Sequence, residues 1–358
     1  MRARHPRAAS GGTPDAPIVV AMAPLPTARG NPFVGQMAAE LTANGCTLIG
    51  ASLRGAAAAD VLHFHWPDHF VNRESTWQSV RGAVKAVLMC TVVRARRGAV
   101  VWTVHNLKPH DRRHPRVERV FWPVFTRLVS GRIFLTGAGR DLAAPGIRPG
   151  SATVVIPHGS YQGVYPAYGG SPSEARQSLG LPAESAPLLF FGQIRSYKNV
   201  PGLLGAFSAL LDRSARLVIA GDGPDRRLIE SIRSAAAEDG RVVVTGRVDD
   251  ADVQRITAAS VGVVLPYHDI FNSGSLFLAL SMARPVLVPR SEVFSEVRQH
   301  VGAAWIEFFD APLSGDDLER FTRSAAALVD SRAEPDLDAF SWERLGTQIV
   351  DFYRALLR

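Results

Sequence analysis

The stretch LLFFGQIRSYKNV, residues 188–200, shows the unit from which the fold of this chain is predicted. Four apolar residues form a strand-like run that ends at a glycine, and two cations three residues apart, Arg195 and Lys198, follow in a polar loop. A helix-like apolar period then begins at residue 201. A short apolar run bounded by glycine indicates a buried strand, and a strand that leads through a loop into a helix is the unit of a parallel α/β sheet.

The same alternation of strand-like runs and helix-like segments extends in both directions from this stretch. The expected strands are residues 18–23, 46–49, 61–65, 100–104, 132–135, 153–156, 188–191, 217–220, 242–245, 262–265 and 285–288. The expected helices are residues 33–43, 76–96, 115–129, 201–211, 224–237, 250–259, 275–283 and 340–358. Repeated units of this kind predict an α/β fold with two doubly wound, Rossmann-like domains facing a shared cleft.

The chain divides at residues 159–173, a segment of Gly, Pro, Tyr and Ser without an apolar period. A chain of 358 residues is too long for one ordinary domain and fits two. We expect an N-terminal domain at residues 17–160, a C-terminal domain at 161–340 and an amphipathic final helix at 341–358. Residues 1–16 are rich in Arg, Ala, Gly and Pro without the apolar core of a signal peptide, and they are predicted to be a disordered leader.

Composition and charge exclude several classes of protein. At 46% hydrophobic and 20% charged residues the chain is globular, and no apolar run reaches the roughly 18–20 residues of a membrane span. The net charge of +7 is modest and comes with no aromatic-basic motif, so nucleic acid is not an expected partner. Because Cys46 and Cys90 have no second Cys or His at metal-ligand spacing, we expect a reduced, cytoplasmic protein without a metal site.

Three segments of the second half follow strands, where the loops of a parallel sheet face the cleft. Arg195 and Lys198 offer a planar fork and a compact charge to phosphate oxygens. Gly221-Asp222-Gly223 is a turn through which backbone can approach a ligand, with Asp222 placed to cap the next helix. Asn272-Ser273-Gly274-Ser275 precedes an apolar helix, whose first N–H groups can hold an anion.

Each of the three segments also has a purely structural interpretation. The two cations can be solvated loop residues, the glycine turn a tight turn with a helix cap, and the small-residue turn the start of a capped, buried helix. The convergence of all three segments on one edge of one sheet favours a site for the diphosphate of a nucleotide ligand. The chain has only three lysines, so composition alone explains a lysine in this loop less easily.

In this order the segments resemble the second domain of the family 4 type of glycosyltransferases with the GT-B fold. The counterparts of the family's motifs are residues 192–198, 221–224, 244–248, 281–286 and, in the final helix that crosses back onto the first domain, 340–344. The resemblance implies an acceptor-binding N-terminal domain and a nucleotide-sugar-binding C-terminal domain. It implies that Lys198 neutralises the donor diphosphate, and that Arg195 does so by proximity because Gln193 stands at the usual Arg position. We also expect donor contacts from His158, because it follows the last strand of the first domain and starts the linker, and from Gly221, Asp222, Gly223, Val248 and Asp269.

One departure from the family pattern affects the mechanism. The family places two glutamates eight residues apart across the donor loop and its helix, and those positions are Ile270 and Leu278 here. Asp269 can replace one of these carboxylates, and nothing replaces the other. The family's retaining transfer is therefore not carried over to this chain.

A narrower resemblance accommodates this departure. The segments that carry it are residues 31–33, 63–67, 103–106, 156–161, 192–195 and 272–275. Together they resemble the GDP-mannose:glycolipid 4-β-mannosyltransferases of bacterial exopolysaccharide assembly, which invert at the anomeric carbon. This resemblance implies inverting transfer of a hexose, mannose from GDP-mannose, to a lipid-linked or oligosaccharide acceptor, with the nucleotide sugar as co-substrate and no other cofactor.

An inverting transfer needs one base to take the proton of the acceptor hydroxyl, and it needs no metal if cations and helix N–H groups hold the leaving diphosphate. Asp68, which follows the strand-ending Pro67, is the first candidate for the base, and His65 and His105 are the others. A histidine pair in a strand is more often structural than catalytic. Gly30 and Asn31 form the turn after the first strand, which either faces the donor phosphate or the acceptor or simply starts a helix.

Two arginine-rich helical segments, residues 76–97 and 112–132, favour contact with anionic lipid at the inner face of the cell membrane. The alternative is that both helices pack on the sheet with cationic outer faces. Two other functions stay open: retaining transfer from another nucleotide sugar such as UDP-glucose, and non-catalytic binding of a nucleotide or glycan. An NAD-dependent oxidoreductase is excluded because residues 23–32 lack Gly-x-Gly-x-x-Gly.

Overall fold

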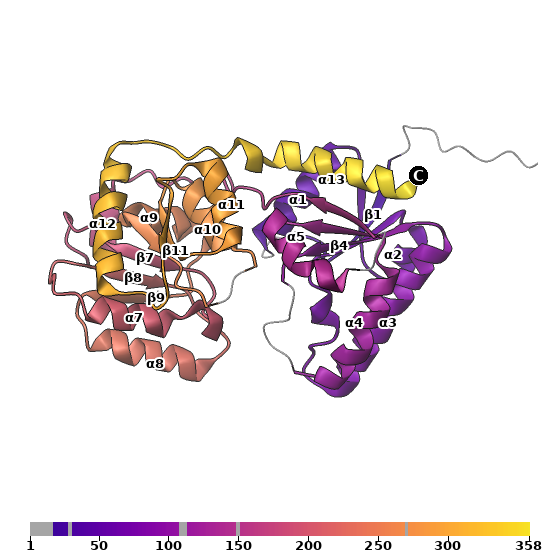
Figure 1. The fold of residues 1–358 in the computed structure, drawn as a ribbon, viewed down its shortest axis with the longest axis horizontal. Coiled ribbons are helices and arrows are strands. Elements are labelled where there is room, and N and C mark those ends of the chain that lie inside the picture. Colours follow the sequence, from indigo (N-terminus) through magenta and orange to yellow (C-terminus); the bar gives the residue numbers. More distant parts are fainter. Residues whose placement is uncertain (1–16, 28–30, 107–112, 148–150, 269–270) are drawn as a thin grey trace, which may run out of the picture.

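The chain folds into two α/β domains, each built on a parallel sheet (Figure 1). The structure is a computed structural model that describes residues 17–27, 31–106, 113–147, 151–268 and 271–358. The predicted leader, residues 1–16, lies outside the described residues, as do Gly30, Asp269 and Ile270.

Within these residues the first sheet has six strands in the order β2-β1-β3-β4-β5-β6, and the second has six in the order β12-β11-β10-β7-β8-β9. The strands of the first are β1 (Val19–Ala23), β2 (Thr47–Gly50), β3 (Val61–Phe64), β4 (Ala99–Val104), β5 (Gly131–Phe134) and β6 (Ala152–Val155). Those of the second are β7 (Leu188–Phe191), β8 (Leu217–Ala220), β9 (Val242–Gly246), β10 (Gly262–Val264), β11 (Val286–Pro289) and β12 (Ile306–Phe309). The predicted pair of doubly wound, Rossmann-like domains is confirmed.

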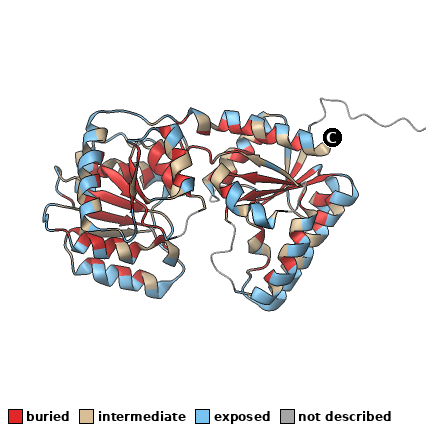
Figure 2. Cartoon of the chain, in the orientation of Figure 1, coloured by how far each residue is buried: buried red, intermediate tan, exposed pale blue. Residues whose placement is uncertain are grey.

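Helices cover both faces of the first sheet, whose central strands are buried along their length (Figure 2). They are α1 (Pro32–Ala43), α2 (Leu53–Ala58), α3 (Thr76–Ala95), α4 (Pro115–Leu128) and α5 (Gly137–Ala143), with a 3₁₀ turn η1 (Pro67–Phe70) after β3. One apolar core lies between the sheet and α1, and another lies between the sheet and α2, α3 and α4. A strand buried on both faces is mostly apolar, which explains why its apolar residues form a run rather than an alternation; the buried polar exceptions are His63, Thr103 and Arg132.

The final helix, α13 (Trp342–Leu357), completes the first domain rather than the second (Figure 1). Leu345, Ile349 and Tyr353 on this helix are buried in the core that α1 forms with the sheet. The backbone of α13 approaches α1 so closely that a Cβ on Gly346 would lie 2.6 Å from the Cβ of Glu40. The apolar period of the last residues therefore reflects packing on a sheet whose strands begin some 320 residues earlier in the chain.

The second sheet is covered by seven helices of the described chain, all sharing one large apolar core. They are α6 (Pro172–Ser178), α7 (Val200–Ser208), α8 (Arg226–Ala237), α9 (Val253–Ala259), α10 (Gly274–Ser281), α11 (Glu292–Val301) and α12 (Gly315–Asp330). Helix α10 is buried at every residue from Leu276 to Leu280, so the segment in front of it is held by packing on several sides.

Sequence reasoning missed several of these elements. Strand β12 and helices α2, α5, α6, α11 and α12 were not expected. β12 carries Glu307 at the edge of the sheet, and α11 and α12 are charged surface helices with only one apolar face. Short or amphipathic elements of this kind give a weak periodic signal, whereas fully buried strands give a strong one.

The two points at which the chain crosses between the domains are bonded to each other. The Ser160 N–H donates to the carbonyl of Phe340 at 2.9 Å, and the indole N–H of Trp342 donates to the carbonyl of Ser160 at 2.8 Å. Any side chain larger than hydrogen at Gly159 would overlap the Trp342 ring. The outgoing and returning segments therefore form a single joint between the domains.

Removal of the Trp342 side chain is expected to destabilise the first domain. Trp342→Phe keeps an aromatic ring and loses the hydrogen bond, so it should lower the free energy of unfolding by about 1 kcal/mol. Trp342→Ala also leaves a cavity and should cost about 3–5 kcal/mol. Denaturant unfolding followed by circular dichroism measures both changes. Trp77→Ala, at a tryptophan that is 68% exposed, is the matched control, and equal midpoints for Trp342→Ala and Trp77→Ala would contradict the proposed joint.

Candidate active site

A small polar cradle lies at the carboxyl end of β7, formed by Gly192, Lys198 and Ser275. Gly192 has φ +127°, which only glycine adopts readily. A Cβ at this position would lie 2.7 Å from Ser275 Oγ and 3.1 Å from Lys198 Nζ. The hydroxyl and the ammonium group therefore converge on the space beside a residue that has no side chain. Residues predicted to share a diphosphate site are brought together here.

The ammonium group of Lys198 lies over an aromatic ring. Lys198 ends the 3₁₀ turn η3 (Ser196–Lys198), is only 9% exposed, and has its Nζ 5.4 Å from the centre of the Tyr267 ring. Next to it, Asn199 adopts a left-handed conformation, with φ +52°, and its side chain accepts the Gly202 N–H to start α7. A cation over an aromatic face is stabilised without being neutralised, so Lys198 keeps its charge available for an anion.

The first turn of α10 supplies the other wall of the cradle. The Ser273 side chain caps this helix by accepting the Leu276 N–H at 3.2 Å, and Gly274 and Ser275 form its first two positions. The N-terminus of a helix carries partial positive charge, which adds to that of Lys198. Asn272 precedes the cap and is half-buried. Arg195 is half-buried in the loop that leads to Lys198, and its carbonyl accepts the Lys198 N–H.

The glycine turn after β8 packs tightly against the loop after β7. A Cβ on Gly221 would overlap the Gly192 carbonyl, and one on Gly223 would overlap the Ile194 carbonyl. The Ile194 N–H also donates to the Asp222 carbonyl at 2.8 Å. These glycines therefore have a steric role, which is to let the two loops lie in contact.

One detail of this turn was predicted wrongly. Asp222 does not cap the following helix; its carboxylate accepts the N–H of Gly223 instead. Asp225 is the cap of α8 and accepts the N–H groups of Arg227 and Leu228, because the helix begins at Arg226, two residues later than expected.

A pocket of about 420 Å³ opens beside the cradle, between the loops that follow β7, β8 and β9. Its wall includes Gly192, the Gly221–Gly223 turn, Arg247 and Val248. Because Gly192 belongs to both the pocket and the cradle, a ligand can lie in the pocket and extend a phosphate group into the cradle. The predicted donor residue Val248 lies in this wall, and Arg247, which sequence reasoning passed over, lies next to it.

In the first domain, Phe33 stands at the centre of an aromatic cluster. Its ring centroid is 5.8 Å from that of His65, 5.0 Å from His105, 4.6 Å from His158 and 5.1 Å from Trp342. Phe33 occupies the first turn of α1, where Asn31 caps the helix by accepting the Phe33 N–H. The Asn31 side chain thus fixes the start of α1. Sequence reasoning missed Phe33, although its place directly after a strand-ending turn could have drawn attention to it.

Two histidines of this cluster, His65 and His105, and the neighbouring His63 are buried and neutral. His63 hydrogen-bonds Tyr353 Oη at 2.6 Å and Thr103 Oγ1 at 2.7 Å, which ties α13 to the sheet. His65 Nδ1 lies 3.2 Å from His105 Nε2, and His65 Nε2 is buried without a partner among the described residues. Burial lowers the pKa of His65 to about 3 and holds the pKa of His63 and of His105 well below the ordinary value. A buried imidazole with so low a pKa accepts a proton poorly near neutral pH.

His158 connects the aromatic cluster to the diphosphate cradle. Its ring stacks on Phe277 of α10 at 4.7 Å, and its Nδ1–H donates to the Gly159 carbonyl at 2.7 Å. A Cβ on Gly274 would lie 3.7 Å from His158 Nε2 and 3.2 Å from Tyr161 Oη. Burial lowers the pKa of His158 to about 4, so the ring is neutral and Nε2 is left as a hydrogen-bond acceptor beside the start of α10.

Asp68 lies in the 3₁₀ turn η1 that follows β3, two residues after Trp66, whose ring stacks on that of His105 at 4.5 Å. It is half-buried, whereas His65 and His105 are buried, and its carbonyl accepts the Val71 and Asn72 N–H groups. Leu278 stands at one of the two positions where the family has glutamates, and its side chain is buried in the core that α10 joins. No described group of three or more His, Cys, Asp and Glu side chains is arranged to hold a metal ion.

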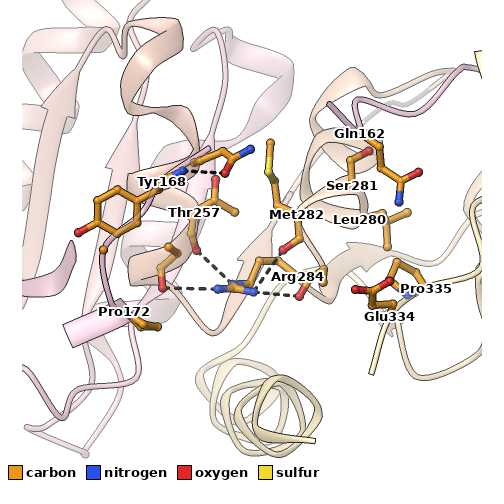
Figure 3. Close-up of a pocket in the computed structure, with 14 residues that line it drawn as sticks. Gln162, Tyr168, Pro172, Thr257, Leu280, Ser281, Met282, Arg284, Glu334 and Pro335 are labelled. Carbon is orange, nitrogen blue, oxygen red and sulfur yellow. Dashed lines mark hydrogen bonds between the residues drawn. The ribbon is translucent and has the colours of Figure 1, made fainter. Parts of the chain in front are cut away.

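Another pocket, of about 370 Å³, lies near the joint between the domains and not at the predicted site (Figure 3). Gln162 and Glu334 line it from the two connecting segments, and Arg284 lies among its lining residues. The Arg284 guanidinium donates to main-chain carbonyls that include those of Thr257 and Met282. Its hydrogen-bonding capacity is thus used to hold the chain, and the pocket offers no spare cation for a ligand.

Two doubly wound domains, with a cationic loop and a helix N-terminus at the cleft edge of the second, define a GT-B glycosyltransferase. The profile of the family described as "Glycosyl transferases group 1" matches residues 186–320. A protein named "GDP-mannose:glycolipid 4-beta-D-mannosyltransferase" from Xanthomonas campestris pv. campestris is 32% identical over 295 residues, which cover 80% of this chain and 77% of that one. The chain belongs to the group 1 glycosyl transferases.

Solved structures agree with this assignment at the level of the fold. Anabaena Alr3699/HepE in complex with UDP and glucose superimposes with a TM-score of 0.70 at 13% identity, covering 94% of this chain and 100% of that one. Sucrose-phosphate synthase from Thermosynechococcus elongatus gives a TM-score of 0.65 at 15% identity, covering 94% and 98%.

A methyl group at Gly192 is expected to fill the cradle. Gly192→Ala places a Cβ 2.7 Å from Ser275 Oγ on a backbone that disfavours side chains, so affinity for a nucleoside diphosphate should fall at least tenfold, about 1.4 kcal/mol. Isothermal titration with GDP measures the loss. Gly205→Ala, at an exposed glycine of α7 whose Cβ meets nothing within 4 Å, is the control and should bind as the wild type does. Equal affinities for the two variants would show that the phosphate does not enter the cradle.

Proposed function

We propose that this glycosyltransferase moves mannose from GDP-mannose to a lipid-linked acceptor with inversion at the anomeric carbon. The observation that carries the proposal is the convergence of Lys198 Nζ and Ser275 Oγ beside Gly192, at the first turn of α10. This cradle suits a diphosphate that gains charge as it leaves, because fixed donors in a buried site stabilise developing charge strongly. The Xanthomonas relative, by its name, supports the donor and the class of acceptor.

The inverting mechanism is supported by what replaces the family's acidic pair. Leu278 is buried and apolar, so it cannot contact a sugar hydroxyl, and Ile270 is the other position. An inverting displacement needs one base on the face of the sugar opposite the leaving group. We assign this role to Asp68, which is half-buried, since a base has to meet its substrate. Buried His65 and His105 then serve to position neighbouring groups, and His158 Nε2 accepts a hydrogen bond from a donor hydroxyl.

Two variants separate the steps of this mechanism. Lys198→Ala removes the diphosphate cation and should lower both GDP affinity and mannose transfer, the latter by about 10²–10³-fold. Asp68→Asn removes the base and should keep GDP affinity while transfer falls by about 10²–10⁴-fold. Transfer of radiolabelled mannose from GDP-mannose to total membrane lipids measures the reaction, and Arg323→Ala, at an exposed cation of α12, is the control.

The same experiment distinguishes the alternatives. A rise in melting temperature with UDP but not with GDP would overturn the choice of donor, since a ligand raises the melting temperature only of the protein that binds it. GDP binding without transfer by the wild type would favour a non-catalytic nucleotide-binding protein. An α-configured product would show retention instead of inversion.

The acceptor's lipid is expected to bring the enzyme to a membrane surface, and α3 offers the contact. No helix among the described residues is both long and apolar enough to cross a membrane. The outer face of α3 exposes four apolar side chains, of Trp77, Val80, Val84 and Leu88. Four cations lie among them or beside them, and all line one open groove of about 980 Å³: Arg73, Arg81, Lys85 and Arg113. An apolar stripe flanked by cations suits the surface of an anionic bilayer.

Two aromatic residues of the second basic segment belong to the core. Phe125 of α4 packs against Phe64 and the Trp102 ring, and Phe121 stacks on Phe125, so both side chains are buried in the core and do not face lipid. Contact of the rest of α4 with lipid stays a prediction. The cytoplasmic location stays a prediction, based on Cys46 and Cys90, which are buried and unpaired.

Loss of the exposed tryptophan should weaken membrane binding. Trp77→Ala is expected to lower the fraction of protein that co-sediments with phosphatidylglycerol vesicles several-fold, because Trp77 is the largest apolar group on this face. Leu211→Ala removes a residue that is 89% exposed on the second domain and should have no effect. Vesicles of phosphatidylcholine should bind little. Equal binding to both lipids, or equal loss in both variants, would show that α3 is not the contact.

A further inference from the structure

Away from the joint, a second set of contacts connects the two domains, and it converges on α5. Glu296 on α11 of the second domain accepts two backbone hydrogen bonds from the first domain. Its Oε1 accepts the Gly137 N–H at 2.8 Å, and its Oε2 accepts the Ala138 N–H at 3.0 Å. Both donors are in the first turn of α5, where N–H groups have no partner within the helix. A carboxylate that takes both is a charge-assisted, bidentate contact.

The second contact on α5 comes from Phe271, which directly precedes the donor loop. A Cβ on Gly139 would lie 3.1 Å from the Phe271 ring and 2.8 Å from Thr136 Oγ1, so the glycine lets the ring rest on the helix. Phe271 packs against the apolar core that the first sheet forms with α2, α3 and α4. One residue further on begins the Asn272–Ser275 segment that walls the diphosphate cradle. The start of this segment therefore rests on a helix of the other domain, whereas Ser275 at its end belongs to α10, which is held in the second domain by its own buried residues.

The two contacts share one helix, so they form and break together. The chain passes between the domains only at the joint around Ser160 and Trp342, which allows rotation about one place. A rotation that separated Glu296 from Gly137 would also withdraw Phe271 from Gly139. The domain arrangement and the position of the donor loop are thus coupled through α5.

We propose that Glu296 and Phe271 are positioning residues that dock the second domain on α5 and hold the donor loop in the arrangement in which transfer occurs. The proposal rests on the proposed function, because it assumes that Asn272–Ser275 binds the donor. The cradle itself is made of Gly192, Lys198 and Ser275, all in the second domain, so it is complete without the docking. Docking instead brings the first domain, with Asp68 and the acceptor, to the donor.

Removal of the carboxylate tests this coupling. Glu296→Ala should lower kcat for mannose transfer at least tenfold, while the affinity for GDP stays within about twofold of the wild type. Glu296→Gln keeps one acceptor oxygen and should recover part of the activity. Glu292→Ala removes an exposed carboxylate one turn earlier on the same helix and should behave as the wild type. If Glu296 served folding alone, Glu296→Ala would lower the melting temperature, but it would not lower kcat while leaving GDP affinity unchanged.

The contact between the Phe271 ring and α5 is tested in the same way. Phe271→Ala should lower kcat, and Phe271→Leu, which still fills the space over Gly139, should restore most of it. Because leucine is a conservative change, this variant keeps the proposal testable even if the alanine variant folds poorly.

A direct measurement of the domain arrangement completes the test. Spin labels on Thr91→Cys in α3 and Glu238→Cys after α8 report the distance between the domains, and the native cysteines are buried. Glu296→Ala should broaden the distance distribution toward longer values, and Glu292→Ala should not. The proposal is overturned if Glu296→Ala matches Glu292→Ala in kcat and in the distance distribution, or if it loses GDP affinity as much as kcat. The distances and GDP affinities do not depend on the sugar, so failure of the GDP-mannose assignment would be seen separately.

Discussion

The hydrogen bond from the Trp342 indole to the Ser160 carbonyl is the constraint on which the arrangement of this protein depends. It joins the segment that leaves the first domain to the segment that returns, and Ser160 N–H to Phe340 carbonyl adds a second bond. Once these segments are joined, α13 is directed onto the first sheet, where its apolar face is buried. Trp342 also contacts Phe33, which in turn packs on His158. The joint between the domains and the edge of the active site are therefore one packed unit.

Parallel sheets explain why the functional residues meet. All strands of a doubly wound sheet end at the same edge, so loops distant in sequence face one cleft. Contact between these loops then requires residues without side chains: Gly221 against the Gly192 carbonyl, and Gly192 beside Lys198. The cradle is created by the absence of Cβ atoms as much as by the groups that line it. The first domain differs, because large side chains fill the corresponding space. The rings around Phe33 bury four histidines and keep them neutral.

The parts of the structure that follow from local pattern could be predicted from the sequence. Buried strands carry continuous apolar runs, and Lys198 and Ser275 lie in the segments that lead from such strands into the next helix, so the sequence could indicate both the fold and the residues of the cradle. The position of Asp222 was misjudged because the start of α8 depends on Pro224 and Asp225, one turn away. The buried faces of Phe121 and Phe125 were missed because composition does not say which side of a helix meets a sheet. Contacts between α5 and Glu296 join residues 159 apart, and no pattern within either segment indicates them.

The return of α13 has a consequence for how this protein can be divided. The first domain is discontinuous in the sequence, since its core includes Ile349 and Tyr353 from the end of the chain. A fragment that stops after residue 160 would expose the face of α1 and the sheet that α13 covers, and His63 would lose its Tyr353 partner. During synthesis on the ribosome this domain cannot reach its final packing until α13 has emerged, by which time the second domain has already been made. The domain that is encoded first is thus the domain that is finished last.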